Sequence, residues 1–152
     1  MTKKRKGYGY KRGNFIPVNK DKYKGSYPIT YRSSFELKAF MYLDKNSKIV
    51  TWGSESVVVK YKDPSRNNTV HRYFLDLVFT IKKNDRVETY IVEIKPKCQT
   101  VPPVRGRKSD KTFLNESTTW MRNSAKWKAA STFAKRRGWK FAIWTENELK
   151  IT

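Results

Sequence analysis

Hydrophobic side chains recur at helical spacing in two segments of the chain. In the first segment, Ser33 or Ser34 precedes the hydrophobic face, and Asn46 follows its last member. Serine and asparagine are favoured at helix ends, where their side chains bond free backbone groups. The second segment runs from about residue 115 to 137 and is followed by Gly138, which suits a C-terminal cap. The pattern therefore predicts two helices.

Hydrophobic runs rich in β-branched residues predict strands between and after these helices. The runs cover residues 57–59, 71–81, 87–96 and 141–145, and residues 83–85 have the composition of a hairpin loop. The predicted order is helix, three strands, helix, strand. Such an order is typical of a mixed α/β or α+β domain built around one sheet.

The charge balance indicates what kind of partner the chain binds. The chain has 34 Lys and Arg against 13 Asp and Glu, a formal net charge of +21. Such a chain binds polyanions, which favours nucleic acid, although a merely soluble protein without chemistry can share this composition. The basic composition of residues 1–26 predicts a flexible arm that binds a phosphate backbone, or a tail that only increases solubility. Residues 27–152 are then expected to form a single domain.

Cysteine and histidine are too scarce in this chain for several kinds of metal site and for an internal disulfide. Cys98 is the only cysteine and His71 the only histidine, so an internal disulfide and paired-His or multi-cysteine metal sites are excluded. A metal would need carboxylate, carbonyl and water ligands, which favours Mg²⁺ or Mn²⁺. No segment approaches the ~20 apolar residues that span a bilayer, and the basic start lacks the apolar run of a secretory signal. We therefore expect an intracellular protein, or one enclosed in a particle assembled there, with no membrane partner.

Two acids interrupt hydrophobic strands on either side of the predicted hairpin. Asp76 in RYFLDLVF and Glu93 in YIVEIKPK are equally distant from the centre of the turn, so antiparallel pairing would place them side by side. Neighbouring carboxylates repel each other, and a divalent cation relieves that repulsion. Lys95 shares a strand face with Glu93 and could hold an attacking water or stabilise charge on a phosphate. Either acid alone could instead be an outward-facing strand residue.

The ordered set of these residues resembles the PD-(D/E)XK nuclease superfamily. It consists of Glu36 on the first helix, Asp76 on one strand and Glu-Ile-Lys at 93–95 on the next. The segments YRSSFE, RYFLDLVF, YIVEIKPK and KWKAASTFAKRRGWKFAIWTE are similar to TnsA-type endonucleases, including small nucleases of T-even-type tailed phages that act in head completion. The resemblance covers roughly residues 27–148. Leu75 stands where the superfamily's name motif has proline, as in many members.

The resemblance implies a restriction-endonuclease-like fold with an αβββαβ core and a metal-dependent endonuclease activity on DNA. Asp76 and Glu93 would bind Mg²⁺, or Mn²⁺, together with the backbone carbonyl of Ile94. Lys95 would be the catalytic lysine, and Glu36 would complete the site or position water. The resemblance also implies processing of packaged DNA as phage heads are completed, in the host cytoplasm or the virion head, with head or portal-vertex proteins as further candidate partners.

Basic residues outside this set are candidates for contacts with the phosphates of double-stranded DNA, although any one of them could be a solvated surface residue. Nothing resembles a base-reading motif, so we expect little sequence preference. Two other functions stay open: a non-catalytic DNA-binding virion protein, and a structure-specific nuclease that resolves DNA junctions. The candidate DNA contacts are Arg105, Arg107, Lys108, Lys126, Lys128, Lys135, Arg136 and Arg137.

Overall fold

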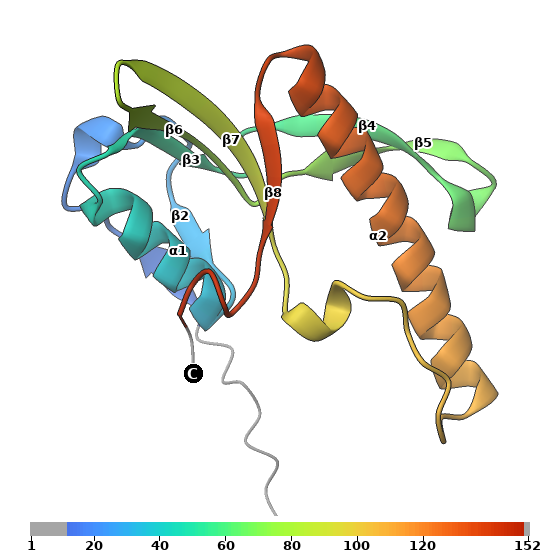
Figure 1. Ribbon diagram of the computed structural model, residues 1–152. Coiled ribbons are helices and arrows are strands. Elements are labelled where there is room, and N and C mark those ends of the chain that lie inside the picture. The colour runs from blue at the N-terminus through green and yellow to red at the C-terminus, as the bar shows by residue number, and fades with distance from the viewer. Residues whose placement is uncertain (1–11, 151–152) are drawn as a thin grey trace, which may run out of the picture.

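A computed structural model describes residues 12–150 of the chain. The helices α1 and α2 lie on either side of a sheet, and a separate hairpin of β4 and β5 extends beside α2 (Figure 1). The order α1, β3, β6, β7, α2, β8 confirms the predicted αβββαβ core. The elements are β1 (Gly13–Phe15), β2 (Ile29–Tyr31), α1 (Ser34–Lys45), β3 (Ile49–Ser54), β4 (Val58–Asp63), β5 (Thr69–Phe74), β6 (Leu77–Lys83), β7 (Arg86–Ile94), α2 (Asp110–Arg136) and β8 (Lys140–Trp144).

Both helices begin at a serine cap. The Ser33 side chain accepts a hydrogen bond from a backbone N–H of the first turn of α1, as predicted. Helix α2 begins at Asp110, five residues before the predicted start, because Ser109 caps it in the same way. It ends before Gly138, whose φ of 68° fits the left-handed conformation of a C-terminal cap. In the part of the chain that the structure describes, no helix is both long and apolar enough to cross a membrane.

The main sheet of the described residues has the strand order β3-β6-β7-β8. The pairs β3–β6 and β6–β7 are antiparallel, and β7–β8 is parallel. Within the β6–β7 hairpin, Lys83 pairs with Arg86 and Leu77 pairs with Val92. This register is the predicted one, because the turn is centred between residues 84 and 85. Continued by one residue, it places the acid that precedes β6 opposite the acid near the end of β7.

Two of the predicted strands differ from the structure. Residues 71–81 do not form one strand: β5 ends at Phe74 and β6 begins at Leu77. The chain bends between them because β5 pairs with β4 in a sheet of its own, and the backbone N–H of Leu75 donates to the carbonyl of Val57. The first core strand is β3, whereas most of the predicted run at 57–59 lies in β4.

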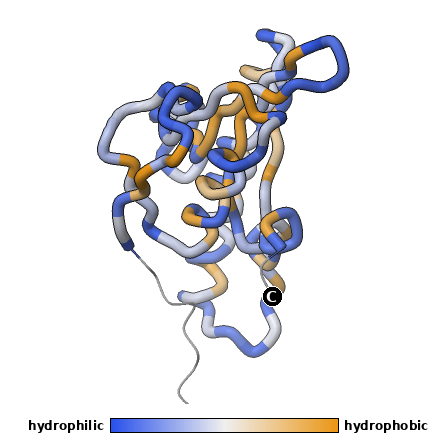
Figure 2. Tube along the Cα trace, turned by 90° about the vertical axis from the view of Figure 1, so that its left-hand side faces the viewer, coloured by the Kyte–Doolittle hydropathy of each residue, from blue (hydrophilic) through white to orange (hydrophobic). Residues whose placement is uncertain are grey.

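Hydrophobic side chains pack into two clusters on opposite faces of the main sheet. Figure 2 shows the hydrophobic stretches of the trace in the interior and hydrophilic stretches in outer loops. Val92 joins the cluster beneath α1, whereas its neighbour Ile91 joins the cluster beneath α2. Leu77 and Val78 divide between the clusters in the same way. Because side chains alternate along a strand, Glu93 belongs to the face that α2 covers.

Residues 12–26, which the sequence assigns to a flexible arm, pack on the domain instead. Strand β1 pairs with β2, and the Tyr23 side chain is buried in the cluster beneath α1. Asp44, buried in α1, accepts a 2.8 Å hydrogen bond from the backbone N–H of Val18. The basic composition of this segment gave no indication of these contacts, because they are made with residues distant in the sequence. Residues 1–11 of the predicted arm lie outside the described residues.

Candidate active site

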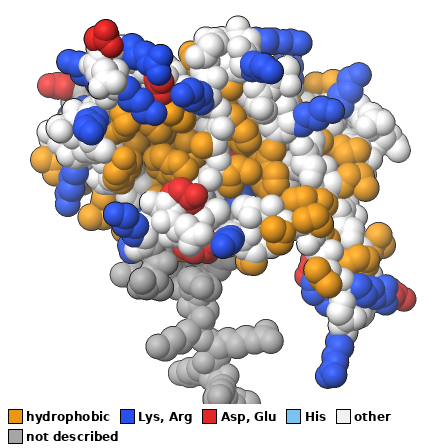
Figure 3. All heavy atoms as spheres, viewed as in Figure 1, with side chains coloured by type: hydrophobic (Ala, Val, Ile, Leu, Met, Phe, Trp, Pro, Cys, Tyr) orange, Lys and Arg blue, Asp and Glu red, His pale blue; other side chains and the backbone are white. Residues whose placement is uncertain are grey.

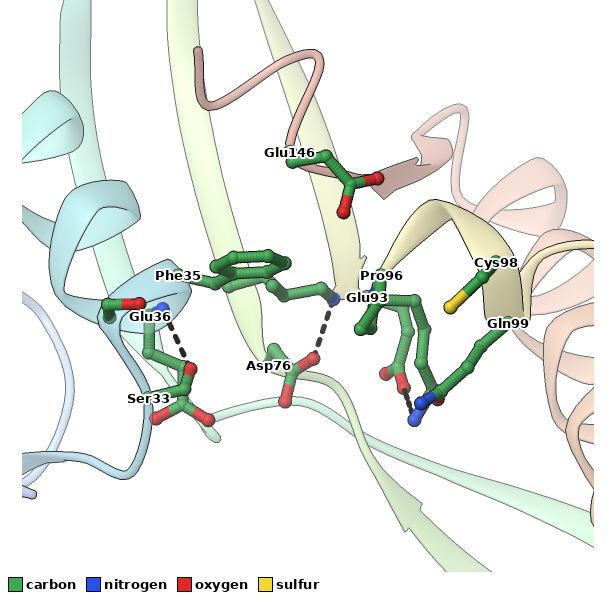
Figure 4. Close-up of a pocket in the computed structure, with 12 residues that line it drawn as sticks. Ser33, Phe35, Glu36, Asp76, Glu93, Pro96, Cys98, Gln99 and Glu146 are labelled. Carbon is green, nitrogen blue, oxygen red and sulfur yellow. Dashed lines mark hydrogen bonds and ion pairs between the residues drawn. The ribbon is translucent and has the colours of Figure 1, made fainter. Parts of the chain in front are cut away.

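A cavity of about 480 Å³ opens where α1 begins and β7 ends. Figure 4 shows its lining, to which α1, β7, the bend before β6 and the loop after β7 all contribute. The four residues that the sequence singles out for chemistry, Glu36, Asp76, Glu93 and Lys95, all line this cavity. Residues separated by up to 59 positions in the chain therefore face one space.

Asp76 lies at the bend between β5 and β6, beside the end of β7. Its Oδ2 accepts a 2.7 Å hydrogen bond from the backbone N–H of Ile94. Burial and the negative charge of Glu93 raise the pKa of Asp76 well above its ordinary value, more than the Ile94 N–H lowers it. The two carboxyl groups are therefore close enough to repel each other, as the register predicts.

Glu93 is 7% exposed, and both of its carboxylate oxygens have partners. Oε1 pairs with the ammonium of Lys95 at 3.3 Å, which confirms that these side chains share a strand face. Oε2 accepts a 2.6 Å hydrogen bond from the Tyr73 hydroxyl. Burial and the Glu93 charge raise the pKa of Tyr73, so the phenol stays protonated and donates.

Glu36 reaches the cavity from the first turn of α1. Its backbone N–H donates to the Ser33 side chain, and its Oε2 accepts a 2.7 Å hydrogen bond from the backbone N–H of Arg32. The side chain thus holds the turn that leads into the helix cap, which is a sufficient structural reason for an acid at this position. Burial raises the pKa of Glu36, so its carboxyl accepts a proton more readily than an exposed one.

The donors in this cavity suit a hard divalent cation. Burial first, and the charge of Glu93 second, raise the pKa of Asp76 despite the nearby Lys95, and a bound cation would offset both causes. Among the residues described, no three His, Cys, Asp or Glu side chains are close enough to hold one ion. The set that fits is two carboxylates, the Ile94 backbone at the cavity edge, and water.

Residues outside the predicted set also contribute to the site. Glu146, which follows β8, lines the cavity, and its Oε1 accepts a 2.7 Å hydrogen bond from the backbone N–H of Lys97. Gln99 also lines the cavity. Tyr73 contacts Glu93 from behind the cavity lining. The sequence gives no signal for this contact, because Tyr73 is buried between two exposed neighbours of β5 and one of them, Phe74, is itself hydrophobic.

The predicted DNA contacts of the loop after β7 differ in their availability. The guanidinium of Arg105 pairs with Asp110 and lies over the Phe113 ring. Lys108 pairs with Glu116 at 2.5 Å. Arg107 is exposed. Two of the three cations are therefore partly neutralised by acids of α2.

The predicted DNA contacts of α2 and of Arg137, the residue that follows it, divide into one inner and four outer residues. Lys126 is half-buried, and its ammonium lies 5.4 Å from the centre of the Tyr73 ring. The others are exposed, and Figure 3 shows Lys and Arg spread around the rim of one face, where they outnumber the acids. These exposed cations are Lys128, Lys135, Arg136 and Arg137.

Comparison with known proteins places this geometry in a family. The family described as TnsA-like endonuclease N terminal matches residues 46–146, a range that contains Asp76, Glu93 and Lys95. A protein of Enterobacteria phage T4, named head completion nuclease, is 41% identical over 143 residues, which cover 91% of this chain and 93% of that protein. The chain therefore belongs to the TnsA-like endonuclease family and has the PD-(D/E)XK nuclease fold.

Proposed function

We propose that this chain is a metal-dependent endonuclease that hydrolyses phosphodiester bonds of double-stranded DNA. The observation that carries the proposal is the meeting of Glu36, Asp76, Glu93 and Lys95 in one cavity. A protein that only bound DNA would gain nothing from buried acids near phosphates, since each acid costs free energy and repels the ligand. Membership of an endonuclease family supports the same reaction.

Asp76 and Glu93, with the Ile94 carbonyl, would hold Mg²⁺ or Mn²⁺. The bound cation would neutralise charge on the scissile phosphate and lower the pKa of water. Lys95 holds the water or stabilises the charge that develops on the phosphate, because its ammonium lies beside Glu93 at the cavity. Glu36, in the first turn of α1, would orient the water and accept its proton. The water oxygen would then bond to phosphorus as a P–O bond breaks, the leaving oxygen would take a proton from solvent water, and a hydroxyl and a phosphate monoester would result.

DNA binding would depend on charge rather than on base sequence. The chain carries a net charge of +21, and several of its cations are exposed on α2. Nothing in the sequence resembles a base-reading motif. Contacts to phosphates position a duplex without selecting its sequence, so we expect weak sequence preference and strong salt dependence. Because the phage T4 relative is named head completion nuclease, we propose that the substrate is packaged phage DNA, cut or trimmed as heads are completed.

Nicking of supercoiled plasmid tests the activity. The wild-type chain should nick plasmid with Mg²⁺ or Mn²⁺ and stop when EDTA is added, and Glu93→Ala and Lys95→Ala should not nick. Absence of nicking with either metal, together with salt-dependent binding, would favour the non-catalytic virion protein. Faster cleavage of a four-way junction than of linear duplex would favour a junction-resolving nuclease.

A further inference from the structure

Tyr73 contacts the candidate site through a strand that is not part of the main sheet. It lies on β5, which pairs only with β4 among the described strands. The residue is 4% exposed and does not line the cavity. Its hydroxyl nevertheless donates a 2.6 Å hydrogen bond to Oε2 of Glu93. The β4–β5 hairpin, an addition to the αβββαβ core, therefore reaches the candidate site through one phenol.

We propose that Tyr73 is a positioning residue that fixes the Glu93 carboxylate in the orientation needed to bind a divalent cation. The inference rests on the proposed function, because that function assigns Glu93 to the metal. A carboxylate held by a hydrogen bond loses less rotational freedom when a cation binds. Outer hydrogen bonds of this kind typically change metal affinity or activity by about 10–100-fold. Tyr73 acts only through Glu93, since it lies outside the cavity lining.

Lys126 supports this arrangement from α2. Its ammonium lies 5.4 Å from the centre of the Tyr73 ring and 5.7 Å from that of the neighbouring Tyr61 ring. A cation is attracted to the face of an aromatic ring, and more strongly where water is partly excluded. Its positive charge also polarises the Tyr73 hydroxyl, which strengthens the hydrogen bond to Glu93. The order of contacts from helix to cavity is Lys126, Tyr73, Glu93.

A purely structural role for Tyr73 makes a different prediction. A buried tyrosine hydroxyl needs a hydrogen-bond partner, and Glu93 supplies one. If that were all, loss of the hydroxyl would change the stability of the metal-free protein but not its affinity for metal. If Tyr73 positions Glu93, metal affinity falls even where the fold is intact.

The experiment compares two tyrosine variants that lose the same atom. Tyr73→Phe keeps the ring and removes the hydroxyl, and the matched control Tyr61→Phe does so at the neighbouring buried ring, also close to Lys126. Mn²⁺ binding is measured by calorimetric titration without DNA, and plasmid nicking is measured across Mg²⁺ concentrations. We expect the Kd of Tyr73→Phe for Mn²⁺ to rise about tenfold or more. Its nicking should recover at high Mg²⁺, and Tyr61→Phe should match wild type.

Each outcome decides a different question. Equal Mn²⁺ affinity of wild type and Tyr73→Phe overturns the inference and leaves the proposed function intact. A wild-type chain that neither binds Mn²⁺ nor nicks DNA overturns the proposed function, and the inference with it. If Tyr73→Phe does not fold, the hydroxyl proton of Tyr73 in the wild type is followed by NMR and assigned by its change in Glu93→Gln. That resonance should shift when Mg²⁺ is added, and a resonance that stays in place overturns the inference.

Discussion

Two carboxyl groups, the buried Asp63 and the half-buried Asp76, have opposite electrostatic surroundings in the same domain. Asp63, at the end of β4, is fully buried and accepts hydrogen bonds from the backbone N–H of Ser65 at 2.9 Å and its hydroxyl at 2.5 Å. Arg122 of α2 adds a third donor at 3.0 Å. Burial alone would raise the pKa of Asp63, but these donors and the Arg122 charge hold it below the ordinary value of 3.8.

Asp76 differs because its strongest charged neighbour is another acid. The Ile94 N–H donates to it, yet burial and the charge of Glu93 raise its pKa well above 3.8. At Asp63 the fold itself stabilises the negative charge. At Asp76 the fold leaves that charge to be stabilised by something else, which is the property expected of a metal ligand. A buried acid is thus informative about function only once its donors are known.

The largest expected effect is the loss of nicking when an acid of the candidate site is replaced, compared with replacement of Asp63. Asp76→Asn and Glu93→Gln should each reduce Mg²⁺-dependent nicking by more than the roughly 100-fold that loss of an outer partner costs, because each removes a charged metal ligand. The measurement is the rate of plasmid nicking at saturating DNA, with circular dichroism to verify folding. Asp63→Asn is the matched control, and its folded fraction should nick at the wild-type rate. Wild-type rates in Asp76→Asn would refute the site.

Asp76→Asn and Asp63→Asn should shift the stability of the metal-free fold in opposite directions. The folded pKa of Asp76 is raised, so at neutral pH its charged form destabilises the metal-free fold, and Asp76→Asn removes that cost. The folded pKa of Asp63 is lowered, so its charge stabilises the fold above the unfolded pKa, and Asp63→Asn loses that contribution. Thermal unfolding in EDTA at neutral pH should give a Tm a few degrees higher for Asp76→Asn and several degrees lower for Asp63→Asn. A lower Tm for both would show that Asp76 is stabilised like Asp63.

The sequence predicts the surroundings of Asp76 better than those of Asp63. Asp76 and Glu93 could be paired from the sequence because a short turn fixes the register of a hairpin. Asp63 could be assigned only to a turn before proline, since its partner Arg122 lies 59 residues away. The break between β5 and β6 was missed for the same reason, because it depends on pairing with β4. Local patterns predicted the αβββαβ core and the cavity acids, whereas contacts supplied by the added hairpin and by α2 required the structure.

A smaller effect concerns how protons compete with metal. Without metal, Asp76 should titrate above 3.8, and Glu93→Gln should lower that pKa because it removes a neighbouring negative charge. Burial should still keep the pKa above its ordinary value. Mn²⁺ affinity of the wild type should fall as pH decreases through the Asp76 pKa, since protons and Mn²⁺ compete for one carboxylate. Carbon-13 NMR of the side-chain carboxyl follows the titration, and a pKa that does not fall in Glu93→Gln would contradict the proposed coupling.

The smallest effect extends the comparison from acids to cations. Lys126 and Lys128 are two residues apart on α2, yet Lys128 is exposed and Lys126 is half-buried over aromatic rings. Burial lowers the pKa of Lys126, and the negative charge of Glu93 opposes this shift. Lys128 thus resembles a solvated charge available to DNA, whereas the surroundings of Lys126 involve the candidate site. The two residues test whether the basic surface of α2 acts as one unit.

Lys128→Ala should weaken binding of any duplex slightly and reduce the slope of log affinity against log salt by about one, as loss of a single phosphate contact does. Lys126→Ala should leave the slope unchanged and instead lower nicking at limiting Mg²⁺, because it removes charge beside Tyr73 and Glu93. Fluorescence anisotropy across salt concentrations, with a catalytically inactive Glu93→Gln background, measures the slopes without cleavage. Equal reductions in slope would place Lys126 on the DNA-contacting surface, as the sequence predicts. Helix α2 would then present one continuous cationic face to the duplex, and the Tyr73 hydroxyl would hold Glu93 without help from Lys126.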